Sequence, residues 1–170
     1  MISITVICTG NAVRSVIAGA LLSSSELGSS LNITTAGTLA VDGRPISLPT
    51  RHALDAVEIG PLHHLSHQLV EADLVDADLV IAMAGEHVRY VRRRHVAAAS
   101  RTATLQRLCR DLGGRDAPLS TRVAELELAE VEIEAWEDVV DPAGGDEATY
   151  IRCAFELQSL ISELLPRLVP

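Results

Sequence analysis

The chain has 170 residues, of which 48% are hydrophobic and 22% are charged, so it can bury the core of one ordinary domain. Its formal net charge of −9 argues against a general nucleic-acid binder, because counterion release needs a clustered basic surface. All 14 basic residues are arginine, which excludes Schiff-base chemistry on lysine and a lysine-dependent phosphate loop of the Walker type.

No apolar run approaches the ~20 residues that a membrane span requires, and no basic-then-apolar leader opens the sequence. The three cysteines, Cys8, Cys109 and Cys153, are too few and too scattered for a disulfide scaffold or a four-thiolate zinc site. We therefore expect a cytoplasmic protein, in a reducing compartment, that does not insert into a membrane.

The first part of the chain predicts two strands with a helix between them. Residues 2–7 are a β-branched run with little polar interruption, which is typical of a strand buried on both faces. A polar loop at residues 8–15 follows, and then a helical pattern that reaches Leu22. The second strand is predicted at residues 31–35.

The middle of the chain alternates helices with two further strands. The sequence predicts helices at residues 50–57, 72–77 and 85–94. It predicts strands at residues 79–83 and 102–105, the first of them an apolar run typical of a buried strand.

The remaining elements are predicted to be helical. One helix is expected at residues 106–112 and a strongly acidic one at residues 121–133. In the last helix the apolar residues form one stripe at helical spacing: Ile151, Ala154, Leu157, Ile161, Leu164 and Leu168. Strands that alternate with helices imply a parallel sheet with helices on both faces, so we expect residues 1–170 to form one α/β domain.

The residues that could carry out catalysis lie in the loop after the first strand. Cys8 and Arg14 are separated by five residues, between a buried strand and a helix. The backbone N–H groups of such a loop form a nest for a tetrahedral anion, to which the helix N-terminus adds positive charge. Gly10 and Asn11 suit the loop because they tolerate positive φ. With Arg14 as an anion fork and the Ser15 hydroxyl beside its thiolate, Cys8 is predicted to be a nucleophile toward phosphorus.

A nucleophile that attacks phosphorus needs an acid to protonate the leaving oxygen. Asp141 lies on a glycine-rich segment before the last helix, and Pro142 favours extended backbone at Asp141. We expect Asp141 to be this acid. A plain turn at the start of the helix is the alternative interpretation.

These segments together resemble the low-molecular-weight protein tyrosine phosphatase family. Residues 8–15, CTGNAVRS, are similar to the family's N-terminal phosphate loop, and residues 141–145, DPAGG, resemble its late general-acid loop. Between them, residues 36–38, 66–69 and 76–83 resemble the family's intervening blocks in the same order. The resemblance implies a four-stranded parallel sheet flanked by helices, and a two-step hydrolysis that uses no metal or cofactor.

The resemblance also implies roles for individual residues. Cys8 attacks phosphorus and forms a phosphocysteine, Arg14 binds the phosphoryl oxygens, and Asp141 protonates the leaving group and then activates water. The supporting residues are Ser15, which steadies the thiolate, Asn11, which fixes the loop, and His64, which buttresses Asn11. The phosphate-binding residues are Thr9, Gly10, Asn11, Ala12, Val13, Arg14 and Ser15. The implied substrate is a protein phosphotyrosine or a small phosphomonoester.

Several positions depart from the family's pattern. Val13 stands where the family usually has a second cysteine that can form a protective disulfide with the nucleophile. Val41 and Ala143 stand where aromatic residues commonly wall the pocket, each worth ~0.5–1.5 kcal/mol of stacking. Ala12 is small where many relatives carry a bulkier aliphatic group. Trp136 is the one nearby ring that could substitute, and without it we expect weak discrimination between aryl and alkyl phosphates.

Two other functions are compatible with an anion-binding loop. An arsenate reductase binds an oxyanion of the same shape, but its thiol-coupled members use two further cysteines near mid-chain, and residues 82–87 contain none. Only a version that takes its second thiol from a small molecule fits. A silent phosphate-binding module is the other alternative. His63, His64 and His67 have no carboxylate or thiolate at ligand spacing, so no metal site is predicted.

Overall fold

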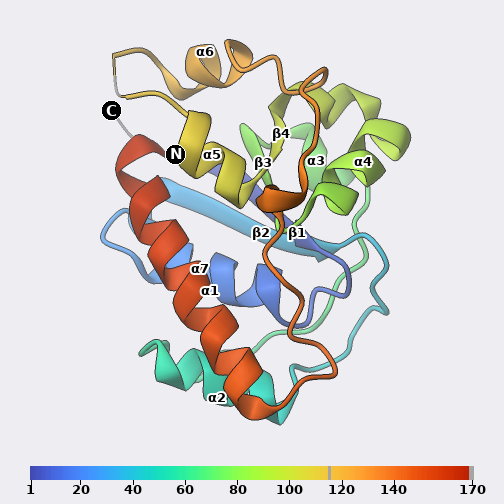
Figure 1. The fold of residues 1–170 in the computed structure, drawn as a ribbon, viewed down its shortest axis with the longest axis vertical. Helices are drawn as coiled ribbons and strands as arrows, with labels where there is room; N and C mark the ends of the chain where they lie inside the picture. The colour runs from blue at the N-terminus through green and yellow to red at the C-terminus, as the bar shows by residue number, and fades with distance from the viewer. Residues whose placement is uncertain (115, 169–170) are drawn as a thin grey trace.

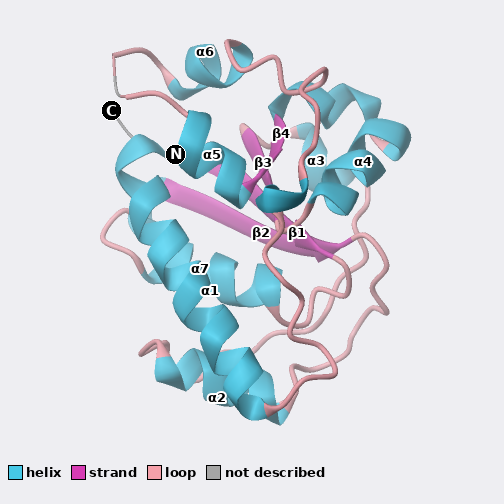
Figure 2. Cartoon of the chain, viewed as in Figure 1, coloured by secondary structure: helices cyan, strands magenta, loops and turns pink. Residues whose placement is uncertain are grey.

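The computed structural model describes residues 1–114 and 116–168, and a sheet of four parallel strands lies at its centre (Figure 1 and Figure 2). The strands are β1 (Ile2–Cys8), β2 (Leu31–Gly37), β3 (Leu79–Ala82) and β4 (Thr102–Thr104). They lie in the order β2-β1-β3-β4, and every pairing is parallel. The predicted fold class, an α/β fold with a four-stranded parallel sheet flanked by helices, is confirmed.

Helices fill the connections between the strands and the part of the chain after β4. The α-helices are α1 (Arg14–Ser24), α2 (Leu48–Ala56), α3 (Ala72–Val75), α4 (Gly85–Arg94), α5 (Leu105–Asp111), α6 (Leu119–Ala124) and α7 (Glu147–Leu168). Short 3₁₀ helices lie at Gly28–Ser30, Val96–Arg101 and Ala135–Glu137. In the part of the chain that the structure describes, no helix is both long enough and apolar enough to cross a membrane.

β1 is a central strand whose alternate side chains enter two different cores. Ile4 and Val6 belong to the core formed with α1, α5 and α7, whereas Ile7 belongs to the core covered by α3 and α4. The long helix α7 contacts α1, α2 and α5, and so covers the first of these cores (Figure 1). The burial of β1 on both faces, predicted from its sequence, follows from this arrangement.

The strand order determines where a ligand can bind. The chain leaves β1 toward β2 on one side, and later returns to place β3 on the other side of β1. The carboxyl ends of β1 and β3 therefore meet where the strand order reverses, which is the usual ligand site in open α/β sheets. The loop predicted to bind phosphate begins at this point, at Cys8.

The acidic helix predicted at residues 121–133 is wrong beyond Ala124, where α6 ends. Glutamates recur every two or three residues there, and like charges at helical spacing repel one another. Glu127 has a positive φ of 49°, which interrupts a helix. The carbonyls of Leu128 and Val131 instead accept hydrogen bonds from Arg92 Nη2, at 2.6 and 2.7 Å.

Candidate active site

The loop after β1 is held against the segment that follows β2. The amide groups of Thr38 and Leu39 donate to the carbonyls of Cys8 and Thr9, each at 2.9 Å. Gly37 allows this close approach, because a Cβ there would lie only 2.5 Å from the Thr9 carbonyl oxygen. The two loops therefore form one rigid edge around the carboxyl end of β1.

Asn11 supplies the special backbone conformation of the loop. Its φ is 50°, in the left-handed region that asparagine tolerates, as predicted. The same prediction is wrong for Gly10, whose φ is not positive. A Cβ on Gly10 would meet no atom within 4 Å, so neither φ nor crowding explains the glycine.

The buried side chain of Asn11 joins the loop to its surroundings. Its Nδ2 donates to Ser15 Oγ and to Thr35 Oγ1, both at 3.0 Å, and its Oδ1 accepts from the His67 amide at 2.9 Å. His64 Nε2 lies 3.0 Å from the Asn11 carbonyl oxygen. Because a carbonyl only accepts, His64 carries its proton on Nε2 and donates it there. This is the buttressing position predicted for His64.

Cys8 and Ser15 form the floor of the loop. Cys8 Sγ lies 3.0 Å from Ser15 Oγ, and both residues are buried. Since Ser15 Oγ accepts a hydrogen bond from Asn11, its own proton is available to the sulfur. The guanidinium of Arg14 and the N-terminus of α1 add positive charge nearby. These groups give the Cys8 sulfur a hydrogen-bond donor and nearby positive charge, the surroundings in which cysteines act as nucleophiles.

Arg14 is a buried cation that connects the loop to a distant part of the chain. Its Nη1 donates to the Val139 carbonyl at 2.9 Å, and its Nη2 donates to Asp141 Oδ2 at 2.8 Å. A longer contact of 3.4 Å joins Nη2 to Thr9 Oγ1. The structure thus brings the predicted nucleophile, cation and acid to one place.

Asp141 lies at the edge of this site, with its side chain 44% exposed. One carboxylate oxygen contacts Arg14 and the other accepts from the Ala143 amide at 3.1 Å. Gly144 has a φ of 83°, and the Gly145 amide closes a turn onto the Pro142 carbonyl at 2.9 Å. The carboxylate is therefore held in place, while an oxygen can still reach a molecule in solvent.

His87 and Glu86 belong to the site but were not among the predicted residues. His87 Nε2 lies 2.9 Å from Thr9 Oγ1, and this hydroxyl also donates to Glu86 Oε1 at 3.2 Å. Burial, and secondarily the charge of Arg14, lower the pKa of His87 to about 3, so its ring is neutral. Both residues lie in the first turn of α4, next to the end of β3. Their place after a predicted buried strand was the available signal.

The start of α4 also holds the segment that carries Asp141. The Gly85 amide donates to Asp138 Oδ1 at 2.7 Å, and the Val139 amide donates to the Met83 carbonyl at 2.8 Å. A side chain at Gly85 would force Ile133 to move, because its Cβ would lie 2.3 Å from Ile133 Cγ2. Hydrogen bonds thus connect the loop of residues 8–15, the end of β3 and the acid segment, residues 138–141, which ends at the predicted acid.

The positions expected to lack an aromatic wall are exposed. Val41 lies on the segment after β2, and its side chain and that of Ala143 are open to solvent. Trp136 packs elsewhere: its ring centroid lies 4.0 Å from the Arg110 guanidinium carbon and 5.3 Å from that of Arg107. It is therefore held against α5 and does not replace the missing wall.

The other candidate ligands and thiols have ordinary surroundings. His67 Nε2 lies 2.9 Å from Asp73 Oδ2, whereas His64 faces Asn11, so the two rings serve different partners. Burial raises the pKa of both Cys109 and Cys153 to about 12, which keeps these thiols protonated. All three cysteines of the chain are free.

Comparison with known proteins places the chain in a family. A family described as low molecular weight phosphotyrosine protein phosphatase matches residues 3–121, which include the whole loop from Cys8 to Ser15. Asp141 lies outside the matched residues. Two relatives named protein-arginine-phosphatase, from Geobacillus stearothermophilus and Bacillus subtilis (strain 168), are 28% identical over 162 and 166 residues. Each comparison covers 95% of this chain and 93% of the relative.

Solved structures agree with the sequence comparison. The YwlE arginine phosphatase from Geobacillus stearothermophilus has a TM-score of 0.76 and 28% identity, over 96% of this chain and 90% of that chain. A low molecular weight protein tyrosine phosphatase from T. tengcongensis has a TM-score of 0.74 and 28% identity, over 97% and 98% of the two chains. The chain therefore belongs to the low molecular weight phosphotyrosine protein phosphatase family and is a cysteine-dependent phosphatase.

Proposed function

We propose that Cys8, Arg14 and Asp141 carry out a two-step hydrolysis of phosphorylated side chains. The Cys8 thiolate attacks phosphorus, and the bond to the leaving atom breaks as Asp141 donates its proton to that atom. The resulting phosphocysteine is attacked by water, whose proton returns to Asp141, and phosphate and the thiolate are released. Arg14 binds the phosphoryl oxygens in both steps, since its planar fork matches two of them.

The observation that carries this assignment is the double contact of Arg14. One guanidinium reaches both Thr9, in the loop around Cys8, and Asp141. The same guanidinium thus lies beside both the loop that carries the nucleophile and the acid, which supports these roles. Thr9, Gly10, Ala12 and Val13 supply the loop backbone, and Ser15, Asn11 and His64 support it. We also propose that residues 1–170 act as one domain, because α7 packs on α1, α2 and α5.

We further infer that the preferred substrate is a phosphorylated arginine of a protein rather than a phosphotyrosine. Two carboxylates lie beside the loop, Glu86 with a side chain 67% exposed and Asp141 with one 44% exposed. Exposed carboxylates favour a cationic guanidinium leaving group over a neutral phenol. The rim positions Val41 and Ala143 offer a phenol no stacking surface. The names of the two protein-arginine-phosphatase relatives support the same substrate class.

A matched pair of peptides tests this substrate assignment. The peptides have one sequence and carry either phosphoarginine or phosphotyrosine, and phosphate release is measured for the wild type and for Glu86→Gln. We expect a higher kcat/KM for phosphoarginine, and a loss of about fivefold for that peptide alone in Glu86→Gln, as for an exposed ion pair. The glutamine still accepts from Thr9, so the variant is well matched. Faster hydrolysis of phosphotyrosine would contradict the assignment.

The arrangement favours hydrolysis over arsenate reduction or silent binding. A reductase needs a second reactive thiol, whereas Cys109 and Cys153 are buried and protonated. A silent module has no use for an acid paired with the anion-binding arginine. Adding arsenate and a small-molecule thiol to the same assay tests the reductase directly. We also propose a reducing compartment such as the cytoplasm, because Val13 offers Cys8 no neighbouring thiol for reversible protection.

A further inference from the structure

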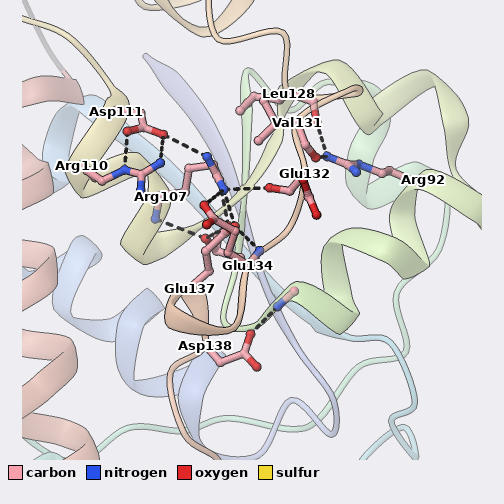
Figure 3. Close-up of polar contacts among 12 residues, drawn as sticks. Arg92, Arg107, Arg110, Asp111, Leu128, Val131, Glu132, Glu134, Glu137 and Asp138 are labelled. Carbon is pink, nitrogen blue, oxygen red and sulfur yellow. Dashed lines mark hydrogen bonds and ion pairs between the residues drawn. The ribbon is translucent and has the colours of Figure 1, made fainter.

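Glu137 is the one fully buried carboxylate among the residues that the structure describes, and it lies four positions before Asp141 (Figure 3). Its Oε2 accepts from Thr104 Oγ1 at 2.8 Å and from Arg107 Nε at 2.9 Å. Its Oε1 accepts from Arg107 Nη2 and from the Glu134 amide, the latter at 2.8 Å. Each carboxylate oxygen therefore has two donors, and the side chain has little freedom to turn.

Arg107 connects this carboxylate to α5. It is itself buried, and its Nη1 donates to Asp111 Oδ2, on the same helix, at 3.1 Å. Its Nη2 also donates to the Glu132 carbonyl at 2.9 Å and lies 3.5 Å from Glu134 Oε2. Figure 3 shows this arginine surrounded by the glutamates of the segment that leads to the acid. The segment is thus anchored on α5 through one side chain.

A buried ion pair is a poor source of stability, because desolvation offsets much of the attraction and an apolar pair often serves as well. Its fixed geometry is the better reason for its presence here. Residues 125–146 contain only one regular element, the short 3₁₀ helix Ala135–Glu137. Burial alone would raise the pKa of Glu137, but the bonds from Arg107, the Glu134 amide and Thr104 hold it below its ordinary value.

The backbone between Glu137 and Asp141 is short and anchored, so the place of Glu137 limits where Asp141 can lie. Directly after Glu137, Asp138 binds the Gly85 amide, and Val139 binds both Met83 and Arg14. Val140 is 72% exposed, and its carbonyl accepts a long contact of 4.0 Å from Cys153 Sγ. Three successive residues, 137–139, are thus fixed on three different elements, and Asp141 follows only two positions later.

We propose that Arg107 and Glu137 are positioning residues for Asp141, which together set how well it protonates the leaving atom. This inference rests on the proposed role of Asp141 as the acid. Neither residue touches the phosphate loop, so their loss acts through the acid segment. A displacement of the acid by about 1 Å is enough to slow its step severely.

The test compares leaving groups. We expect Glu137→Gln, which keeps the shape but removes the charge, to lower kcat/KM for phenyl phosphate by about tenfold, because kcat/KM reports the first step, in which the leaving group departs. For 4-nitrophenyl phosphate, which needs little protonation, kcat/KM should fall by less than about twofold. Inhibition by inorganic phosphate should be unchanged, because the loop is intact. Equal slowing of both substrates would overturn the proposal, since a merely structural role moves both alike.

A matched control and a double variant separate positioning from general loosening. Arg92→Gln removes the hydrogen bonds to the Leu128 and Val131 carbonyls, which lie earlier in the segment that leads to Asp141. If loosening of this segment alone does not displace the acid, the ratio of kcat/KM for phenyl phosphate to kcat/KM for 4-nitrophenyl phosphate should stay unchanged. In an Asp141→Asn background, Glu137→Gln should have no further effect on phenyl phosphate. A selective loss in Arg92→Gln, or fully additive losses in the double variant, would contradict the positioning role.

Arg107→Lys and Asp141→Asn distinguish a failure of the positioning role from a failure of the proposed acid. Arg107→Lys keeps the charge but loses the two-pronged contact, and it should show the same selective loss if Glu137→Gln does not fold. If Asp141→Asn is selective for phenyl phosphate but Glu137→Gln and Arg107→Lys are not, only the positioning role fails. If Asp141→Asn itself shows no selectivity, the proposed acid is wrong and the positioning role falls with it.

Discussion

The guanidinium of Arg14 and the carboxylate of Asp141 meet at 2.8 Å although 127 positions separate them in the sequence. Arg14 also donates to the Val139 carbonyl, so it holds the backbone of the acid segment as well as the acid itself. In the proposed mechanism one residue therefore binds the phosphoryl group and places the proton donor. A change at Arg14 is expected to affect both functions.

The nucleophile is tested by Cys8→Ser. We expect loss of measurable turnover, with the fold and the affinity for inorganic phosphate largely intact, because backbone N–H groups and Arg14 rather than sulfur hold the anion. Phosphate binding is measured by calorimetry and turnover by phosphate release. Hydrolysis near the wild-type rate would remove Cys8 from the mechanism.

Replacement of Arg14 by lysine keeps the charge and removes the fork. Arg14→Lys should lower kcat/KM by at least about tenfold, because a point charge cannot hold two phosphoryl oxygens, the Val139 carbonyl and Asp141 together. Steady-state kinetics on an aryl phosphate measure the loss. Unchanged kinetics would show that charge alone is sufficient at this position.

The acid is tested by Asp141→Asn with leaving groups of different quality. General acids contribute ~10²–10⁴ in rate, so kcat/KM, which reports the step in which the leaving group departs, should fall by that order for a substrate with a poor leaving group. An activated aryl phosphate should slow far less. Equal slowing of the two substrates would mean that Asp141 only holds its loop and Arg14 in place.

The missing aromatic wall can be rebuilt. Ala143→Tyr should raise kcat/KM for a phosphotyrosine peptide by about fivefold, the equivalent of roughly 1 kcal/mol of stacking. Trp136→Ala should not change that value, because the ring packs on Arg110 and Arg107. Efficient phosphotyrosine hydrolysis by the wild type, with no gain in Ala143→Tyr, would show that the wall is unimportant.

Burial of neutral His87 predicts a dependence of stability on pH. Its pKa is about 3 in the folded chain and near 6.5 when unfolded, so between these values the unfolded chain binds the extra proton. The free energy of unfolding therefore falls as pH decreases from 6.5 toward 3. From pH 7 to 5 the wild type should lose about 2 kcal/mol more than His87→Gln. Urea unfolding at both pH values measures this, and equal losses would indicate a protonated His87.

The sheet could be predicted from the sequence because its strands are apolar runs buried on both faces. The four predicted strands match β1 to β4 within two residues at each end. The failures lie where long-range contacts override local pattern. The Leu128 and Val131 carbonyls bind Arg92 instead of continuing α6, and no local signal indicates this.

The site could be predicted in part for a similar reason. Cys8, Arg14 and Ser15 lie within eight residues, so local spacing predicts them as a group, and the family pattern adds Asp141 and His64 to the candidate site. The pair Arg107 and Glu137 has no such signal, because α5 and the segment at residues 132–137 meet only in the folded chain. His87 was missed because a buried neutral histidine has the same sequence signature as a core residue.

The central place of β1 has a consequence during synthesis. Both neighbours of β1 in the sheet, and the residues that hold Arg14, leave the ribosome after Cys8 does. At ~5–20 residues per second, Asp141 emerges roughly 7 to 27 seconds later than Cys8. Until then Cys8 has neither the proposed acid nor the burial that the finished fold provides, and Val13 gives it no neighbouring cysteine. The Cys8 thiol therefore stays exposed through most of synthesis, and the proposed site is assembled only when the last third of the chain is complete.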